Sequence, residues 1–431
     1  MDPITIAAIG MGVMFLLIVL QVPIGISMAV VGITGFGILA GFTPAVTIIG
    51  TECVSALGNV DLAVIPLFLL MGNFATASGI SGDIYNLAYA FLGHRRGGLA
   101  LSTIGGCGFF GAICGSSPAT AATFGRVALP EMLKRGYSTS FATGCIAAGG
   151  TLGSMVPPSV IMIIFAVQAE EFIFDLFIGA IIPAVLEVLL YAIVITIYVR
   201  VRPAAGPAGP RASWSERFKT LWGSWAALII GIAVIGGIYF GIFTVTQAAS
   251  VGAAMSFVFV FFRGKLTWKV FWETLIETAN STAMIYIIII GANILTYFIT
   301  LTRMPDFLVT VISGLPVPNI LILFILLVVY LVLGSIFDTV AAMLITLPFV
   351  LPLITRMGYH PVWWGIVNVA IIETGMITPP IGLNVFILHG VTKVPLSTIY
   401  RGTMPFVISD FVRVAILVLF PSLVLWLPSL R

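Results

Sequence analysis

Charged residues are scarce in this 431-residue chain, since Asp, Glu, Lys and Arg together make up only 8% of it. Average soluble domains contain about 25% of these residues. Hydrophobic residues account for 60% of the chain, and its mean hydropathy is +1.18. These values exclude a soluble globular domain and are typical of an all-α polytopic membrane protein, whose apolar surface faces the lipid bilayer.

Cysteine and histidine, which supply most disulfides and transition-metal sites, are also few. The chain has 4 cysteines in apolar segments without Cys-x-x-Cys spacing, and 3 histidines in loops or near a helix end. A disulfide framework or a metal cluster is therefore not expected. No nucleophile, base and orienting group occur together, so we expect a protein that is not an enzyme. Nothing in the sequence indicates a nucleic-acid partner.

A cleavable signal peptide is a further absence. The apolar segment 4–22 follows Asp2 without a basic region and has no small-residue cleavage site, so we expect it to remain as a helix. About 20 apolar residues are needed to cross the hydrocarbon core of a bilayer. On this basis we expect further spans at 24–41, 61–78, 138–168 (interrupted), 176–200, 222–240, 243–262, 283–301, 361–390 (interrupted) and 404–428.

Two apolar stretches, 98–131 and 319–350, are too long for one span, and each has a polar centre. We expect each of them to form a re-entrant hairpin, which enters and leaves the membrane on the same side. Two other segments, 83–93 and 268–279, mix apolar and polar residues at helical spacing. This pattern predicts helices that lie along the membrane interface.

The distribution of Lys and Arg predicts the orientation, because cytoplasmic loops of membrane proteins are enriched in both residues. With a periplasmic N-terminus, most of the 19 Lys and Arg residues fall on the inner side. The outer side then carries Glu170, Glu171 and Asp175. The segment 202–219, which is rich in proline and basic residues, is expected to be a cytoplasmic linker between two halves, 1–201 and 220–431.

The two halves repeat a pattern of glycine and proline. Gly115-Ser116 and Gly334-Ser335 are 219 residues apart, and Pro157-Pro158 and Pro379-Pro380 are 222 apart. With five full crossings in each half, the second half must enter the membrane from the opposite face. We therefore predict inverted-topology repeats, a common plan of secondary transporters, with the tips of the two hairpins meeting near the middle of the membrane.

Each half also contains a predicted break in a helix. In the first half we expect the helix that starts at 138 to end near Gly150, and Pro157-Pro158 to open a second half-helix towards 168, because proline suits the first turn of a helix. A break leaves backbone carbonyl and N–H groups unpaired, which lipid tolerates only around a cavity. Free carbonyls and hydroxyls can bind a small cation, and half-helix N-termini attract an anionic group.

The polar side chains at the tips and breaks are the candidates for such a site. They are Ser116, Ser117, Thr120, Thr151 and Ser154 in the first half, and Ser335, Asp338, Thr339, Thr374 and Thr378 in the second. Other interpretations stay open, because Ser, Thr and Asp are also ordinary N-caps, and Asp338 can be only the cap of the returning helix. A pair of prolines can also be only a kink.

Five further polar residues lie near these segments. Glu373 is an intramembrane ionisable residue, and its role is cation attraction, proton coupling or a structural hydrogen bond. We expect Asn73 and Asn293 to bridge helices, whereas Asn384 either lines the cavity or bridges helices. Arg126 lies on the cytoplasmic side of the first tip. We expect its long basic side chain to extend to the membrane interface and not to contact the substrate.

At these residues the sequence resembles the large membrane subunit of TRAP transporters, the tripartite ATP-independent periplasmic carriers of organic acids. The matching stretches are IPLFLLMGN (65–73), GSSPATAAT (115–123), LPEMLKRGY (129–137), GTLGSMVPPS (150–159), GSIFDT (334–339) and ETGMITPPIGLN (373–384). The likeness covers essentially the whole chain. It implies an elevator-type transporter of the bacterial inner membrane, in which the hairpins and broken helices form a mobile domain.

The resemblance also implies two or more sodium ions as cofactors. One would bind around Ser116, Ser117, Gly153 and Ser154, and the other around Ser335, Thr374, Gly375 and Thr378. The implied substrate site consists of Ser117, Pro118, Thr120, Ser154, Pro157, Pro158, Asp338, Thr339, Pro379, Pro380 and Asn384. Ile336 and Phe337 replace the serines of the first tip, so the second sodium site is expected to rely more on backbone carbonyls.

Two protein partners follow from the same resemblance: a periplasmic substrate-binding protein and a small four-helix membrane subunit, here a separate polypeptide. We therefore expect sodium-coupled import of a small carboxylate. One alternative is a self-sufficient ion-coupled transporter of dicarboxylates or oxyanions, which needs no binding protein. Another is a structural or signalling subunit without transport. The sequence does not identify the organic acid, since C4-dicarboxylates, keto acids, sugar acids and sialic acids all fit.

Overall fold

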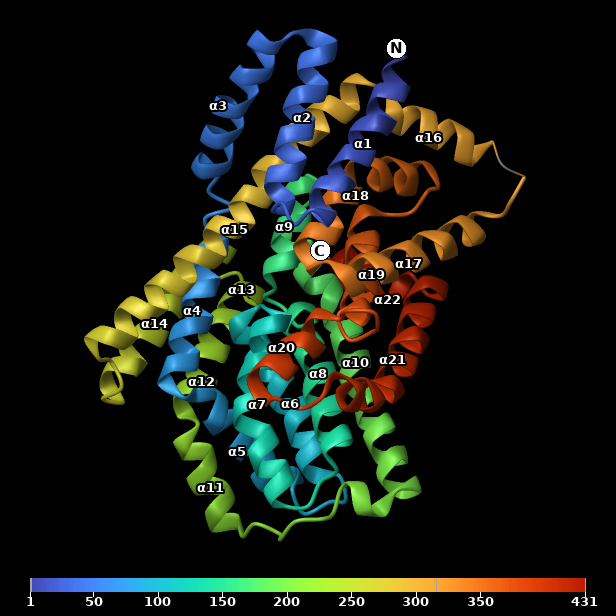
Figure 1. Cartoon of the computed structure of the whole chain (residues 1–431). Coiled ribbons are helices and arrows are strands. Elements are labelled where there is room, and N and C mark those ends of the chain that lie inside the picture. Colours follow the sequence, from blue (N-terminus) through green and yellow to red (C-terminus); the bar gives the residue numbers. More distant parts are fainter. Residues whose placement is uncertain (1, 315, 431) are drawn as a thin grey trace.

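The computed structural model describes residues 2–314 and 316–430, and within these ranges the chain forms helices and no strand (Figure 1). The helices of the first half are α1 (Pro3–Val19), α2 (Ile24–Ala40), α3 (Phe42–Gly58), α4 (Val64–Ser78), α5 (Ile80–Leu92), α6 (Gly98–Cys114), α7 (Ser117–Lys134), α8 (Thr139–Met155), α9 (Val160–Gln168) and α10 (Ile173–Val201). Six helices of the described chain are long and apolar enough to span a membrane, or up to nine if each bent pair counts as one span. The prediction of an all-α polytopic membrane protein is confirmed.

The second half begins after the short turn Pro203–Ala205. Its helices are α11 (Trp214–Gly223), α12 (Trp225–Gly231) with its continuation to α13 (Gly237–Tyr239), α14 (Val245–Phe262), α15 (Trp268–Leu301), α16 (Met304–Ser313), α17 (Asn319–Ile336), α18 (Thr339–Arg356), α19 (Pro361–Gly375), α20 (Leu383–Thr392), α21 (Leu396–Leu419) and α22 (Ser422–Leu425). In Figure 1 the long helix α15 runs along one side with α4 and α14 beside it, while α6, α7, α8 and α20 lie near the centre.

The centre of the molecule is formed by the first limbs of the two broken helices. In α8 every residue from Phe141 to Met155 is buried, and in α19 every residue from Val362 to Gly375 is buried. The pair α6–α7 packs around α8, and the pair α17–α18 packs around α19. Each predicted hairpin therefore lies against the broken helix of its own half.

Two predicted helix ends are wrong. Helix α8 continues past Gly150 to Met155, because glycine is tolerated inside a buried helix and the first proline, Pro157, constrains only the residue before it. Val156 accordingly has an extended backbone with φ −81° and ψ 120°. The last long helix, α21, spans Leu396–Leu419 and not 404–428, since the helix stops before Pro421.

The interfacial helix predicted at 268–279 is also wrong, because this segment is the first part of the 34-residue helix α15. No glycine or proline occurs from Trp268 to Ile290, so nothing ends the helix between the interfacial pattern and the apolar span. Helix α3 was not predicted, since threonines and Glu52 interrupt its apolar pattern. Glu52 is buried, and it accepts hydrogen bonds from Asn293 Nδ2 (2.9 Å) and Tyr297 Oη (3.0 Å) of α15.

The predicted linker 202–219 is partly helical, since α11 starts at Trp214. Ser213 caps this helix, and the Ser213 side chain and Glu216 form a reciprocal capping box. Before α11 the linker is bonded to the first half: Ser138 N–H donates to Ala205 O (3.1 Å), and Gly209 N–H donates to Gly93 O (2.9 Å). The segment therefore runs along the ends of helices in the first half.

Glycine allows the closest helix contact in the centre, between α8 and α21. A Cβ atom added to Gly402 would lie 1.8 Å from Ser140 O, and one added to Gly144 would lie 2.1 Å from Gly402 O. Because both obstacles are backbone atoms, neither can move away as a side chain does. The two helices can hold this spacing only if both positions lack a side chain.

We predict that Gly402→Ala lowers the melting temperature of the detergent-purified chain, because separating α8 from α21 costs about 1–3 kcal/mol of stability. The matched control is Gly12→Ala in α1, where an added Cβ meets no atom within 4 Å. This control is expected to melt at or slightly above the wild-type temperature, since alanine favours a helix more than glycine does. Equal melting temperatures for the two variants would contradict the packing argument.

Candidate functional site

The first hairpin tip lies between α6 and α7. Gly115 ends α6 with a positive φ of 64°, a backbone conformation that residues other than glycine rarely adopt. Ser116 then caps α7, and its Oγ accepts a hydrogen bond from Ala119 N–H (3.5 Å). Thr120 Oγ1 donates to Ser116 O (2.8 Å). The tip is thus a tight turn whose carbonyl and hydroxyl oxygens are gathered at the start of α7.

The second tip differs in its details. Helix α17 runs to Ile336, so Ser335 lies in the last helical turn, where its hydroxyl donates to Val332 O (2.7 Å). Asp338 caps α18 by accepting from Val340 N–H (2.9 Å) and Ala341 N–H (3.1 Å). Asp338 is therefore the N-cap of α18.

Each tip is bonded to the break of its own half. Val160 N–H, at the start of α9, donates to Gly115 O (3.3 Å), and Ser117 N–H donates to Ser154 Oγ (3.3 Å). In the second half, Gly382 N–H, directly before α20, donates to Ser335 O (2.8 Å). The backbone groups that the breaks leave free are therefore partly paired with the neighbouring tips.

Glycines bring each tip and break close together. A Cβ atom on Gly153 would lie 2.5 Å from Ser116 O and 2.6 Å from Thr120 Oγ1. A Cβ atom on Gly375 would lie 2.7 Å from Ser335 N. Oxygen atoms of the first tip thus lie directly against the last turn of α8, and the last turn of α17 lies against the end of α19.

The two halves also meet at this point. Asn384 Nδ2, in α20, donates to Ser117 Oγ (2.7 Å) at the first tip. Thr339 Oγ1, at the second tip, donates to Glu373 Oε1 (2.9 Å) in α19. The side chains of Ser117 and Ser154 also lie near the Glu373 carboxyl group. Five polar side chains, which come from both tips and both breaks, therefore converge here.

The convergence leaves two buried polar atoms without a hydrogen-bond partner, Glu373 Oε2 and Asn384 Oδ1. Within the described ranges Glu373 forms no ion pair, although its residue is only 1% exposed. The N-termini of α7 and α18 begin at Ser117 and Thr339, beside this carboxyl group, and their dipoles favour a negative charge. A buried carboxylate with one free oxygen and hydroxyl neighbours suits a hard cation such as sodium.

Two threonines at the second break have hydroxyl oxygens that can bind a cation. Thr374 Oγ1 donates to Ala370 O (2.8 Å), and Thr378 Oγ1 donates to Thr374 O (2.6 Å). Because each hydroxyl proton points to a carbonyl, the oxygen lone pairs are left to accept a cation. The side chain of Thr374 is buried, whereas that of Thr378 is partly exposed.

Other predicted residues are placed differently. Pro157 and Pro158 are buried, but Pro379 and Pro380 are exposed, and Pro118 is partly exposed. Thr151, a candidate hydroxyl of the first break, points away from the tip, because α8 continues through it and its Oγ1 lies 2.8 Å from Glu187 Oε1 in α10. Its predicted place at the break is therefore wrong.

The asparagines predicted to bridge helices do so. Asn73 Nδ2 donates to Thr278 Oγ1 (2.9 Å), and Asn293 joins Gln168 (2.9 Å) to Glu52 (2.9 Å). Arg126 is exposed on α7 and lies outside the group of converging residues.

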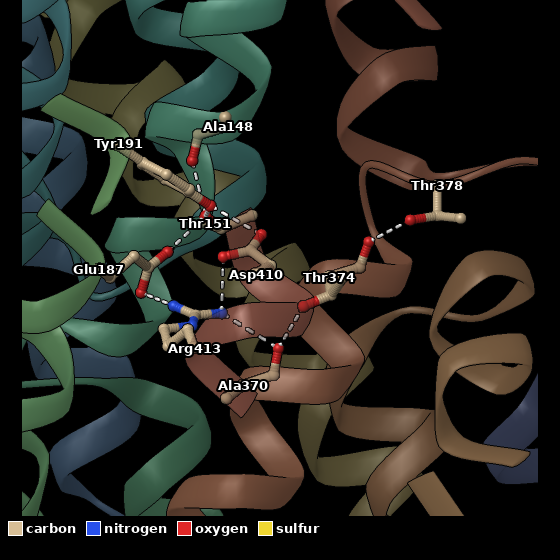
Figure 2. Close-up of polar contacts among 9 residues, drawn as sticks. All are labelled: Ala148, Thr151, Glu187, Tyr191, Ala370, Thr374, Thr378, Asp410 and Arg413. Atoms are coloured by element: carbon tan, nitrogen blue, oxygen red, sulfur yellow. Dashed lines mark hydrogen bonds and ion pairs between the residues drawn. The ribbon is translucent and has the colours of Figure 1, made fainter. Parts of the chain in front are cut away.

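One buried charged cluster beside the site was not predicted. Arg413 of α21 forms ion pairs with Glu187 of α10 and Asp410 of α21, and Tyr191 and Thr151 complete the group (Figure 2). The available signal was three ionisable residues inside apolar helices, which are rare and functional by default in membranes. The sequence alone did not show that the three side chains meet.

Comparisons with known proteins agree with this architecture. Among solved structures, the Alcanivorax borkumensis YdaH transporter aligns with a TM-score of 0.60 at 14% identity, covering 89% of both chains. Neisseria gonorrhoeae MtrF aligns with a TM-score of 0.54, also at 14% identity, covering 87% of this chain and 84% of that one. At this level of identity the two structures support the fold alone.

Sequence relatives are more similar. The C4-dicarboxylate TRAP transporter large permease protein DctM of Pseudomonas aeruginosa is 35% identical over 85% of this chain and 86% of its own length. The ectoine permease TeaC of Halomonas elongata is 31% identical over 96% and 97%, and the sialic acid permease SiaM of Vibrio cholerae is 29% identical over 95% of both. The profile of the DctM component of tripartite ATP-independent periplasmic transporters matches residues 11–423. The chain therefore belongs to the family of TRAP transporter large permeases.

Proposed function

We propose that this chain performs sodium-coupled import of a small organic acid through the site where Ser117, Ser154, Thr339, Glu373 and Asn384 converge. The observation that carries the proposal is the buried Glu373 carboxyl group, which has one free oxygen and no ion-pair partner in the described chain. It lies among hydroxyls that come from both hairpins. A cation is the ligand that would complete this arrangement.

The proposed sodium ligands are grouped at the two tip–break contacts. The first set is Ser116, Ser117, Gly153 and Ser154, and the second set is Ser335, Thr374, Gly375 and Thr378. Support comes from the short tip–break distances and from the hydroxyls of Thr374 and Thr378, which donate their protons to carbonyls. Hydroxyl and carbonyl oxygens are the ligands that hard monovalent and divalent cations prefer.

The proposed substrate site lies between the same segments. Four helix N-termini, those of α7, α9, α18 and α20, follow the tips and breaks, and helix N-termini attract anions. Because Glu373 already places a negative charge there, a substrate carboxylate could bind only after cations offset that charge. This requirement would make substrate binding depend on sodium. The substrate residues in this proposal are Ser117, Pro118, Thr120, Ser154, Pro157, Pro158, Asp338, Thr339, Pro379, Pro380 and Asn384.

We also propose how the chain is oriented in the membrane and which part of it moves. The halves 1–201 and 220–431 are inverted repeats, the N-terminus is periplasmic, and the hairpins and broken helices move as an elevator domain in the bacterial inner membrane. The chain works with a periplasmic substrate-binding protein and a small four-helix subunit. In support, the relative named isethionate TRAP transporter permease protein DctMQ, from Oleidesulfovibrio alaskensis, aligns with 92% of this chain but with only 62% of its own length.

The names of the relatives suggest the substrates to test first, namely C4-dicarboxylates, sialic acid and ectoine. The chain and its small subunit are reconstituted in proteoliposomes, and uptake of radiolabelled succinate, sialic acid and ectoine is measured with and without a periplasmic binding protein for each substrate. Uptake driven by an inward sodium gradient, but not by potassium, is expected. Equal uptake without the binding protein would favour the self-sufficient transporter. No uptake of any organic acid with every partner present would favour a structural subunit.

We predict that Ser117→Ala weakens sodium binding about 30-fold, because it removes one proposed ligand and the hydrogen bond from Asn384, each contributing about 1 kcal/mol. The measurement is ²²Na⁺ binding to the purified chain. Ser102→Ala is the matched control, since Ser102 is another buried serine of the first hairpin and donates only to Gly98 O of its own helix (2.7 Å). Similar affinities for the two variants would remove Ser117 from the site.

We predict that Glu373→Gln weakens sodium binding by at least tenfold, because interactions with a charged group contribute about 1.5–3 kcal/mol and glutamine keeps the shape without the charge. The same ²²Na⁺ assay applies, with Glu171→Gln outside the site as the control. The hydrogen bond from Thr339 can persist, so the fold is expected to remain intact. Unchanged sodium affinity would show that Glu373 is only a structural hydrogen-bond acceptor.

A further inference from the structure

The Arg413 network is the group of Thr151, Glu187, Tyr191, Asp410 and Arg413 (Figure 2). The side chains of Arg413 and Glu187 are 0% exposed, and that of Asp410 is 1% exposed. Arg413 pairs with Glu187, and its Nη2 lies 3.2 Å from Asp410 Oδ1. Tyr191 Oη donates to Asp410 Oδ2 (2.8 Å). Four of the five residues lie on α10 and α21, outside the tips and breaks.

The network reaches the first proposed cation site through Thr151. Thr151 Oγ1 lies 2.8 Å from Glu187 Oε1, 3.1 Å from Tyr191 Oη and 2.6 Å from Ala148 O. Ser154, whose Oγ accepts from the first tip, lies one helical turn further along α8. The last turn of α8 is therefore fixed by the network at one end and by the tip at the other.

The network reaches the second proposed cation site through the backbone of α19. Arg413 Nη2 donates to Ala370 O (3.2 Å), the same oxygen that accepts from Thr374 Oγ1 (2.8 Å). Thr378 Oγ1 in turn donates to Thr374 O (2.6 Å). Figure 2 shows this row of contacts running from Arg413 through Ala370 and Thr374 to Thr378. Two proposed sodium ligands are thus connected to the guanidinium group.

The repeat in the sequence relates two of these contacts to each other. Ala148 and Ala370 are 222 residues apart, and so are Tyr191 and Arg413. This is the offset that relates the two proline pairs. In the first half the Tyr191 hydroxyl contacts Thr151 Oγ1, which lies against Ala148 O, and in the second half the Arg413 guanidinium donates directly to Ala370 O. Equivalent positions of the two halves therefore meet at Asp410, which contacts both Tyr191 and Arg413.

A buried ion-pair network moves as a unit, because separating its charges in a low-dielectric interior is costly. A shift of the last turn of α8 on cation binding would move Thr151 and Glu187, and with them Arg413 and the Ala370 carbonyl. That carbonyl sets the direction of the Thr374 hydroxyl at the second site. Contiguous contacts of this kind carry energetic coupling between sites.

We infer that Arg413 is a positioning residue that couples the two cation sites, so that sodium bound at one site raises the affinity of the other. The inference rests on the proposed sodium sites. It assigns Arg413, Glu187 and Thr151 a role in cooperativity, while the ions themselves are bound by other residues. The coupling is reciprocal, as linkage between two binding sites requires.

The experiment measures ²²Na⁺ binding to the full chain purified in detergent, over a range of sodium concentrations. The wild type is expected to give a sigmoidal curve. Arg413→Lys is expected to lower the Hill coefficient towards unity. Lysine lacks the planar guanidinium group that contacts two carboxylates and a carbonyl at once. Arg135→Lys, at the partly exposed ion pair with Glu131, is the matched control and should keep the wild-type curve.

Thr151→Val provides a second test that keeps all the charges in place, so it can decide even if Arg413→Lys does not fold. It is expected to lower the Hill coefficient towards unity and to raise the half-saturating sodium concentration about fivefold, as the loss of one buried hydrogen bond does. Thr151→Ser keeps the hydroxyl and should restore the sigmoidal curve. Melting temperatures recorded in parallel separate a general loss of stability from a loss of coupling.

The possible binding curves distinguish a failure of the coupling from a failure of the sodium sites. An unchanged Hill coefficient in Thr151→Val would overturn the inference, even if the variant melts earlier. A wild-type curve that is hyperbolic would overturn it as well, but would leave the sodium sites standing. No ²²Na⁺ binding to the wild type would instead refute the proposed function, and the coupling with it.

Discussion

The structure depends on one backbone interaction that occurs in both halves, a hydrogen bond from each helix break to the neighbouring hairpin tip. Val160 N–H donates to Gly115 O in the first half, and Gly382 N–H donates to Ser335 O in the second. Lipid offers no partner to an interrupted helix, so the break must find one in the protein. Each hairpin supplies that partner, and a broken helix and its hairpin therefore stabilise each other.

The site follows from this pairing. Because each tip lies directly against its own break, the Ser154 hydroxyl accepts from Ser117 N–H at the first tip, and the Ser116 carbonyl and the Thr120 hydroxyl lie against Gly153. The contact from Asn384 to Ser117 then joins the two halves. Helix N-termini surround the same point, so a negative group is stable there and an added cation has oxygen atoms to bind. The same turns that complete the backbone thus arrange the polar groups.

The sequence predicted the tips, the breaks and their convergence, because hydroxyls, glycines and prolines stand out in an apolar chain and have local causes. The predictions failed where a structural feature depends on tertiary packing and not on the neighbouring sequence. The end of α8 at Met155 depends on burial, since its glycines are tolerated in a fully buried helix. The Arg413 network depends on side chains that are far apart in sequence, so the residues carried a signal but their pairing did not. The length of α15 is different, because its cause is local: the absence of glycine and proline from 268 to 290 is visible in the sequence.

The molecule contains two kinds of buried charge, which differ in how the protein pairs them. Arg413 has two carboxylates, a carbonyl and nearby hydroxyls as neighbours, so its charge is balanced inside the protein. Glu373 has a hydroxyl donor and no ion-pair partner in the described chain, and one of its oxygens is free. A charge that is paired within the protein holds its helices together, and the paired groups can pass a displacement from one helix to the next. A buried charge without such a partner is costly to the fold, and the proposed sodium ion is the group that would offset this cost at Glu373.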